Sequence, residues 1–357
     1  MVSEADVLKA LAVIIDPDFN QNIVSLGFVK NIAISASSVS LTIELTTPAC
    51  PVKEEFQRQA DAALLALPGI TESNITMSSK VAPAKSNNGI PGVANIIAVA
   101  SGKGGVGKST TTVNLAVAMA QTGARVGLLD ADIYGPSIPR MMGLSGKKPQ
   151  VDTQTKNIIP LENYGLKTMS IGYLVEEEKA MIWRGAMVAG ALKQLLTEVE
   201  WGELDYLFID MPPGTGDAQL TLTQSVPVTG AVLVTTPQDI ALIDCRRGID
   251  MFQKVHVPTL GIVENMSQFI CPHCGESSAI FSEGGAERLS QEQNSEVLAQ
   301  IPLDIKIRQN ADEGTPIVAA MPDSDQAKIY QDLAGAVARK ISILNRRQVN
   351  IPIIMQG

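Results

Sequence analysis

The sequence predicts an α/β protein in which a parallel β-sheet flanked by helices follows a smaller N-terminal α+β domain. The chain has 357 residues, more than one typical hydrophobic core accommodates. A segment rich in Ser, Pro, Asn and Gly, residues 78–92, separates two stretches with regular hydrophobic periodicity. The second stretch alternates short apolar runs with helical segments, which is typical of parallel strands covered on both faces.

Residues 1–80 form the predicted α+β domain. In SEADVLKALAVIID, Ser3 and Asp6 have the spacing of a capping box, and Pro17 is expected to end the helix. VSLTIELTT alternates like a half-buried strand, and PVKEEFQRQADAALLAL returns to helical spacing. The residues expected on the apolar face of the first helix are Val7, Leu8, Leu11, Ile14 and Ile15, and those of the second are Val52, Phe56, Ala60, Ala63 and Leu67.

Residues 93–340 form the predicted sheet domain. Residues 81–92 lack hydrophobic periodicity and are expected to be a flexible linker, and residues 341–357 a C-terminal tail. Five apolar runs of the sheet domain have the length and the Val, Ile and Leu content of buried parallel strands. They are NIIAVA (95–100), RVGLLD (125–130), DYLFID (205–210), GAVLVTT (230–236) and TLGIVEN (259–265).

Charge and hydropathy restrict the partners and the compartment. The formal net charge is −9 and no run of Lys or Arg occurs, so we expect neither nucleic acid nor a membrane as a partner. The first residues, MVSEADVLKA, lack the apolar core of a signal peptide, and no apolar run reaches the roughly 18 residues of a membrane span. We expect a cytoplasmic protein, or one of an organelle matrix such as the plastid stroma, whose four cysteines serve as metal or redox ligands.

The segment SGKGGVGKST follows the first predicted strand of the sheet domain and matches the phosphate-binding pattern G-x-x-x-x-G-K-[ST]. Its glycines let backbone N–H groups surround a polyphosphate at the start of a helix. Lys108 is expected to contact the β- and γ-phosphates, the Ser109 hydroxyl to bind Mg²⁺, and Thr110 to support the α-phosphate. The sequence therefore predicts a P-loop NTPase with these nucleotide-binding residues: Gly102, Lys103, Gly104, Gly105, Val106, Gly107, Lys108, Ser109 and Thr110.

An alternative is a dinucleotide-dependent dehydrogenase, because the same glycines match G-x-G-x-x-G. Asp130 ends the next predicted strand, about where a ribose-binding acid would lie. However, Lys108 and Ser109 have no role in that fold, and Asp210 ends the strand DYLFID, where a Mg²⁺-nucleotide site needs an acid that usually holds the metal through water. An ATP site with Mg²⁺ is therefore favoured.

Three motifs in this order, KGGVGKS, DADIYGPS and DMPPGTGD, resemble the deviant P-loop ATPases of the MinD and ParA superfamily over residues 93–340. The resemblance implies that Lys103 crosses a dimer interface to the partner's nucleotide and that Asp132 orients the attacking water. Lys103, Asp132 and Lys108 are thus the candidate catalytic residues, and Asp130 is an accessory acid beside them. Phosphoryl transfer needs such positioning and charge stabilisation rather than a covalent intermediate.

Two further residues carry roles implied by this resemblance, each with an alternative. Asp217 lies in the segment that resembles the second switch of the superfamily, or it is a helix cap before AQLTLTQSV. Asn265 resembles the adenine-contacting asparagine of the superfamily, although an Asx-turn is equally compatible with the sequence.

The cysteine pair in ENMSQFICPHCG narrows the resemblance. Together with DADIYGPSIPRMMG and WRGAM, this segment resembles the Mrp branch, the iron-sulfur cluster carriers related to bacterial ApbC, although Ala186 stands where we expect proline. Cys271 and Cys274 are only two ligands, whereas a [4Fe-4S] cluster needs four thiolates, which the same pair from each subunit of a symmetric homodimer would supply. The resemblance implies a homodimer that hydrolyses ATP slowly, holds a labile cluster at its interface and transfers it to apo iron-sulfur proteins, with cluster assembly factors as further partners.

Other interpretations of the pair remain open. Zinc shared across a dimer would use the same thiolates. A thioredoxin-like redox pair is less favoured, because Gly275 and the polar residues after Cys274 predict a loop, and His273 is expected to face solvent. With a zinc clasp the chain would be a MinD- or ParA-like positioning ATPase, but its tail carries only Arg346 and Arg347 as basic residues, too few for a membrane or DNA surface.

The cysteine in TTPACPVKEEF is a candidate accessory residue. Cys50 is expected at the N-cap of a helix with Pro51 at N1, where the positive helix end would lower the thiol pKa and make it nucleophilic or metal-binding. DPDFNQNIVSLGFV and LTTPACP resemble the small SufT- and PaaD-like domain of iron-sulfur assembly factors, over residues 3–80. The alternative for Cys50 is a buried small residue, and Cys245 is expected to belong to the core.

Overall fold

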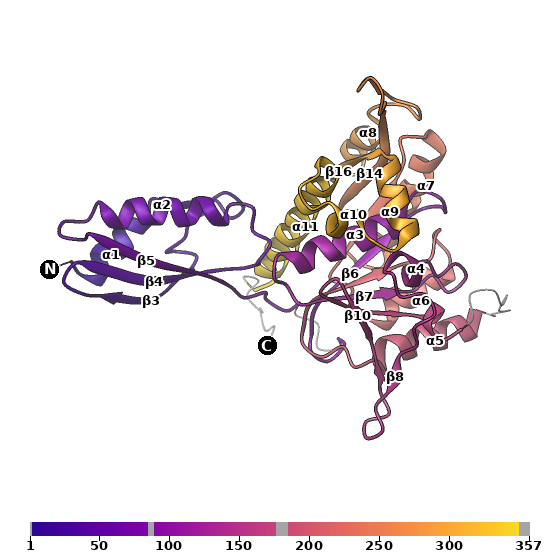
Figure 1. The fold of residues 1–357 in the computed structure, drawn as a ribbon, viewed down its shortest axis with the longest axis horizontal. Coiled ribbons are helices and arrows are strands. Elements are labelled where there is room, and N and C mark those ends of the chain that lie inside the picture. Colours follow the sequence, from indigo (N-terminus) through magenta and orange to yellow (C-terminus); the bar gives the residue numbers. More distant parts are fainter. Residues whose placement is uncertain (1, 85–88, 176–184, 350–357) are drawn as a thin grey trace, which may run out of the picture. The chain divides into compact units, whose positions relative to one another are not determined.

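The computed structural model describes residues 2–84, 89–175 and 185–349. The chain divides into two compact units, one formed by residues 1–82 with 338–357 and the other by residues 83–337 (Figure 1). Four residues of the predicted linker, 85–88, lie outside the described residues. The predicted C-terminal tail is helical as far as Val349, where the last helix ends, and the residues beyond it are also outside the described part.

The N-terminal unit is a three-stranded sheet whose central strand is antiparallel to one neighbour and parallel to the other. Two helices cover one face of this sheet (Figure 1), so the central strand alternates buried and partly buried residues, as its sequence predicts. The elements are α1 (Glu4–Leu11), β1 (Ile15–Asp16), β2 (Gln21–Asn22), β3 (Val29–Ile34), β4 (Ser38–Leu45), α2 (Lys53–Leu65) and β5 (Glu72–Ser79).

Helix α1 begins as predicted and ends earlier than predicted. The Ser3 side chain accepts from the Asp6 backbone N–H, and the Asp6 carboxylate accepts from the Ser3 N–H at 2.9 Å, which completes the capping box. The helix ends at Leu11 rather than at Pro17, because the backbone then turns into the β1–β2 pairing. As a result Ile14 is buried outside the helix and Ile15 is half exposed.

The last turns of the C-terminal helix belong to the N-terminal unit and contact two of its aromatic residues. The guanidinium of Arg346 lies 4.8 Å from the ring centroid of Phe19 and 5.6 Å from that of Phe28. It also donates to the carbonyl oxygen of Leu26 at 3.0 Å. A cation held over two rings stabilises the contact more when it is partly desolvated, as here.

The larger unit contains a nine-stranded, mostly parallel sheet with helices on both faces (Figure 1), so the predicted fold class is confirmed. The strand order is β10-β11-β7-β12-β6-β13-β14-β15, and β16 pairs with β14 outside this path. Its strands are β6 (Val93–Ala100), β7 (Val126–Asp130), β10 (Leu161–Asn163), β11 (Leu166–Ser170), β12 (Leu204–Asp210), β13 (Gly230–Thr235), β14 (Thr259–Ile270), β15 (Ser277–Ser278) and β16 (Val297–Leu303).

The helices that begin in this unit and a small two-stranded pairing complete the described elements. The helices are α3 (Lys108–Gln121), α4 (Ile138–Met141), α5 (Gly185–Thr197), α6 (Asp217–Ser225), α7 (Asp239–Lys254), α8 (Gly285–Glu292), α9 (Ile305–Glu313), α10 (Ile317–Ala320) and α11 (Asp325–Val349), with a 3-10 turn at Ile171–Tyr173 and the pair β8 (Gln150–Val151) and β9 (Ile158–Ile159). Within the described residues, none of the helices combines the length and the apolar character needed to cross a membrane.

All five predicted strands are present, as β6, β7, β12, β13 and β14, and they run parallel to one another. The central strands β7, β12 and β13 are almost wholly buried, which explains their continuous apolar sequences. Their carboxyl ends meet at one edge of the sheet, where ligands bind in folds of this kind. Asp130, Asp210 and the loop after Ala100 therefore lie close together.

Candidate nucleotide and metal sites

The P-loop connects β6 to α3 and depends on glycines for its shape. Gly107, the N-cap of α3, has φ +80°, a left-handed conformation that costs a residue with a side chain free energy. Gly102 lies directly against the backbone of Asp244 in α7, so a Cβ there would overlap it. The sequence pattern thus reflects both the curl of the loop and the close approach of a neighbouring helix.

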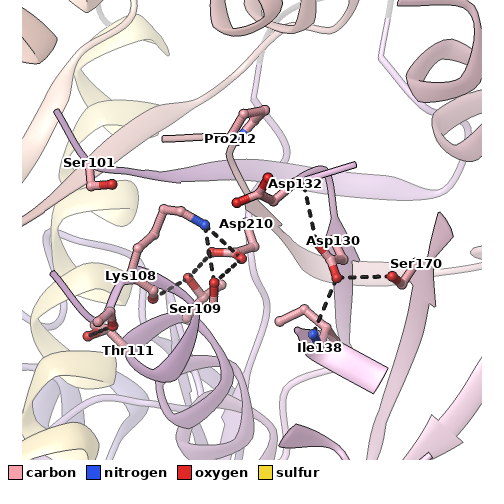
Figure 2. A network of polar contacts seen from close by, with 12 residues as sticks. Ser101, Lys108, Ser109, Thr111, Asp130, Asp132, Ile138, Ser170, Asp210 and Pro212 are labelled. Carbon is pink, nitrogen blue, oxygen red and sulfur yellow. Dashed lines mark hydrogen bonds and ion pairs between the residues drawn. The ribbon is translucent and has the colours of Figure 1, made fainter. Parts of the chain in front are cut away.

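Lys108, Ser109 and Asp210 form one polar network at the start of α3 (Figure 2). The Lys108 Nζ lies 2.8 Å from Asp210 Oδ2, and both side chains are almost completely buried. The Ser109 hydroxyl donates to the same carboxylate oxygen at 2.6 Å. The predicted phosphate-binding lysine and the predicted Mg²⁺ ligands are therefore adjacent.

Thr112 is a member of this network that the motif did not reveal. Its buried hydroxyl donates to Asp210 Oδ1 at 2.8 Å and to the carbonyl oxygen of Lys108 at 2.9 Å. Because Thr112 follows Lys108 by four residues, it lies on the same face of α3, and that spacing is the signal that could have found it.

The Asp130 carboxylate, at the end of β7, is used in hydrogen bonds to neighbouring segments of the chain. One of its oxygens accepts from the backbone N–H of Asp132 at 3.1 Å, and the other accepts from Ile138 N–H at 3.3 Å and from the Ser170 hydroxyl at 2.9 Å. Burial, together with the neighbouring carboxylate of Asp210, raises the pKa of Asp130 to about 8. Figure 2 shows these contacts at the end of β7, beside the Lys108 network.

A cavity of about 210 Å³ opens in front of the P-loop. Asp132 contributes to its wall, and burial raises the pKa of this carboxyl. Lys103 is partly exposed and is not among the lining residues, and its carbonyl oxygen accepts from the Ser101 hydroxyl at 2.9 Å. The lining residues are Ser101, Gly104, Gly105, Gly107, Lys108, Ser109, Thr110, Asp132, Ser137, Met141 and Pro213.

The structure gives Asn265 a contact with the P-loop and places Asp217 at the start of a helix. The buried side chain of Asn265 donates to the carbonyl oxygen of Val106 in the P-loop at 2.8 Å, so it binds across the sheet edge rather than forming a local Asx-turn. Asp217 is the first residue of α6, after the N-cap Gly216. Its place in a switch segment stays a prediction.

The cysteine hairpin, residues 269–278, extends from the end of β14. Its ladder has two residue pairs, Phe269–Ser278 and Ile270–Ser277. The Cys271 N–H donates to Glu276 and the Cys271 carbonyl accepts from Gly275, both at 2.9 Å. Backbone N–H groups of Cys274 and then His273 lower the pKa of the Cys271 thiol, and Cys274 and His273 are exposed.

This hairpin offers one pair of thiols for a metal. Among the residues described, no three His, Cys, Asp or Glu side chains are grouped as a metal site within one chain would require. Cys245 is buried in α7 as predicted, and burial raises its pKa to about 12. Two residues of WRGAM, Trp183 and Arg184, lie outside the described residues.

The expected N-cap role of Cys50 is wrong. Helix α2 begins at Lys53 with Val52 as its N-cap, so Cys50 precedes the helix by two further residues. Burial is the largest influence on this thiol and raises its pKa to about 11 instead of lowering it. Cys50 is therefore a weakly acidic thiol packed against the core of its unit.

Both units match known protein families. Residues 92–338 match the family described as NUBPL iron-transfer P-loop NTPase, and residues 4–77 match the iron-sulfur cluster assembly protein family. The iron-sulfur cluster carrier protein of Synechocystis is 47% identical over 349 residues, covering 96% of this chain and 99% of the relative. The iron-sulfur cluster carrier protein of Escherichia coli is 50% identical over 330 residues, covering 91% and 89%.

Solved structures agree with this assignment. A nucleotide-binding protein from Archaeoglobus fulgidus, solved in complex with ADP, is 41% identical and aligns with a TM-score of 0.58 over 67% of this chain and 92% of its own. The cell division ATPase MinD of Pyrococcus furiosus, 24% identical with a TM-score of 0.53 over 68% of this chain and 98% of its own, shows the shared fold. The chain therefore belongs to the NUBPL iron-transfer P-loop NTPase family and carries an N-terminal iron-sulfur cluster assembly domain.

Proposed function

We propose that this chain is an ATP-binding iron-sulfur cluster carrier that accepts a labile cluster and transfers it to apo-proteins. The observation that carries the proposal is an accessible pair of thiols, Cys271 and Cys274, on a hairpin that continues a strand of the nucleotide-binding sheet. Relatives about half identical over most of their length have this function in their names. A cargo that must be handed on needs ligands that a receiving protein can reach.

The proposed cargo is a [4Fe-4S] cluster held between two copies of the chain. Such a cluster takes four thiolates, and each chain offers two at one hairpin. In a dimer with two-fold symmetry the same surface of each copy faces the other, so two hairpins supply four thiolates. The lowered pKa of Cys271 favours the thiolate that binds iron.

The donor groups of the P-loop network fit ATP with Mg²⁺. The Ser109 hydroxyl and the Asp210 carboxylate are neighbouring oxygen donors, the type that Mg²⁺ prefers, and Lys108 supplies a charge for phosphate oxygens. Bound Mg²⁺ would supply neutralisation of the phosphate charge. Lys108 would hold the phosphates, Asp132 would accept a hydrogen bond from the attacking water, and Lys103 of the partner subunit would stabilise charge on the γ-phosphoryl group.

Weak hydrolysis is expected from this arrangement. Among the lining residues Asp132 supplies the carboxyl near the phosphate site, so orientation of the attacking water depends on one side chain. Replacement of Lys103 or Asp132 by Ala should reduce ATP turnover at least about tenfold, because each acts on the charge or the water of the transition state. Lys148→Ala, at an exposed position of the same unit, is the matched control. Unchanged turnover in both variants would contradict the mechanism.

The cargo is tested by anaerobic reconstitution with iron and sulfide, followed by analysis of iron, sulfide and zinc per dimer. About four irons and four sulfides per dimer are expected, with loss in Cys271→Ser and retention in Cys50→Ser. Transfer is then measured as activation of an apo-protein that requires a [4Fe-4S] cluster. One zinc per dimer without iron would instead make the pair a structural clasp.

A further inference from the structure

Strand β14 contacts the P-loop and also continues into the cysteine hairpin. Its residue Asn265 donates to the carbonyl oxygen of Val106 at 2.8 Å, and six residues later the chain reaches Cys271. At the rise of a strand, six residues span about 20 Å. The nucleotide loop and the thiols are therefore joined by a short length of one strand.

The contact between β14 and the P-loop is close. A Cβ added to Gly107 would overlap the Asn265 amide, and the end of the Met266 side chain lies 4.0 Å from the same point. The glycine at this position thus makes room for the Asn265 amide, and Met266 lies in van der Waals range of the same point. Movement of Val106 or Gly107 when phosphates bind would act directly on them.

The strand is irregular at this point. Met266 has φ +56°, a strained conformation for a residue other than glycine. Between the pairs Asn265–Ile301 and Phe269–Leu303, β14 carries two more residues than β16, and the Ser267 hydroxyl donates to the carbonyl oxygen of Ile301 at 3.1 Å within this bulge. Such bulges bend a strand and redirect the residues that follow.

The chain after the cysteine hairpin returns to β14 at the start of α8, where it is bound to Glu264, the neighbour of Asn265. The buried carboxylate of Glu264 accepts from the N–H of Ala286, at the start of α8, at 2.8 Å, and from the Gln300 amide at 3.2 Å. The segment that contains the cysteine hairpin therefore leaves the end of β14 at Ile270 and returns at α8, whose start is bound to Glu264.

We propose that Asn265 and Met266 are positioning residues that transmit the nucleotide state of the P-loop to Cys271 and Cys274. The Asn265 amide follows the Val106 carbonyl, and the left-handed bulge at Met266 sets the direction in which the strand continues into the hairpin. The proposal rests on the proposed function, since it concerns the same thiols. It is nevertheless testable without iron.

The test measures alkylation of Cys271 and of Cys274 by iodoacetamide in the full-length apo protein, resolved by peptide mass spectrometry. Rates are taken without nucleotide and with saturating Mg·ADP or a non-hydrolysable Mg·ATP analogue, whose affinities are measured for every variant. We expect nucleotide to change the wild-type rate at least about fivefold, the lower end of typical allosteric coupling. In Met266→Gly the ratio should fall to within about twofold of one while nucleotide still binds, and in Asn265→Ala the ratio, taken at nucleotide concentrations that saturate that variant, should fall as far.

Asn163→Ala is the matched control. Its amide also donates to a backbone carbonyl, that of Met142, at 2.8 Å, but away from β14, so the nucleotide effect should persist in it. Met266→Gly keeps the Asn265 contact and carries the test if Asn265→Ala weakens nucleotide binding. No nucleotide effect in the wild type, or the full effect in both β14 variants, would overturn the proposal. A dimer that merely covers the thiols would give the second result, and failure of cluster binding alone would leave these rates unaffected.

Discussion

Two glycines of the P-loop with nearly equal positive φ should respond differently to alanine. Gly105 has φ +81° and Gly107 has φ +80°, so alanine meets a positive φ that disfavours a side chain at both positions. A Cβ at Gly105 meets no atom within 4 Å, whereas a Cβ at Gly107 would overlap the amide of Asn265. The comparison therefore separates backbone strain from loss of the contact with β14.

The expected magnitudes follow from these two terms. A left-handed residue with a Cβ costs about 1–2 kcal/mol, which is the whole expected effect of Gly105→Ala. Gly107→Ala should also break the buried hydrogen bond from Asn265 to Val106, for a further cost of about 1–3 kcal/mol. In an Asn265→Ala background the overlap is removed, so Gly107→Ala should then cost only about as much as Gly105→Ala.

Urea unfolding followed by tryptophan fluorescence measures these differences. Both tryptophans of the chain, Trp183 and Trp201, belong to the unit of residues 83–337, so the signal reports on the unit that contains the P-loop. Equal losses for Gly105→Ala and Gly107→Ala would refute the reasoning. So would additive losses in the Gly107→Ala, Asn265→Ala double variant, because the two sites would then not interact.

Three further predictions concern buried charge, a cation over aromatic rings and a thiol. Lys108→Met should lower the free energy of unfolding by about 3–5 kcal/mol, because Asp210 is left buried without its cation. In urea unfolding, the double variant with Asp210→Asn should recover much of this loss. A larger loss in the double variant would contradict the prediction. Arg346→Ala should speed hydrogen exchange of the β4 amides about tenfold, and Arg346→Lys should give a rate between those of Arg346→Ala and the wild type. Unchanged exchange would show that the contact with the two phenylalanine rings contributes nothing to stability. Cys50 should be alkylated more slowly than Cys271 at pH 8, and its rate should rise toward pH 11. Between about pH 9 and pH 11 the folded thiol keeps its proton, whereas the unfolded thiol, with a pKa near 9.0, has lost it. The free energy of unfolding of this unit should therefore fall over that range.

The sequence predicted most of what depends on local pattern. The five buried strands have continuous apolar sequences because helices cover both faces of the sheet, and the P-loop motif specifies its backbone and its lysine together. The edge strand β16 was missed because its burial is partial, so its sequence lacks a continuous apolar run. The capping box gave the start of α1, whereas its end depends on the pairing of β1 with β2.

Contacts between distant segments could not be predicted. The sequence placed Asn265 near the nucleotide, but its bond to Val106 depends on the neighbourhood of β14 and the P-loop. The error at Cys50 has a physical cause: the helix start was placed too early, and burial outweighs the weak field of a helix end. The bulge at Met266 could not be predicted, because position 266 is neither glycine nor asparagine, the residues that usually indicate a positive φ.

The shortness of the cysteine hairpin has a thermodynamic consequence. Two residue pairs of an exposed ladder are too few to hold a rigid thiol geometry by themselves. If the hairpin binds the proposed cluster, part of the free energy of binding would be used to order the ligands, so net affinity would be lower than a preformed cage would give. If the pair holds the proposed cluster, a hairpin this short would let one thiolate be replaced at a time by an incoming ligand. A site built this way favours delivery over storage.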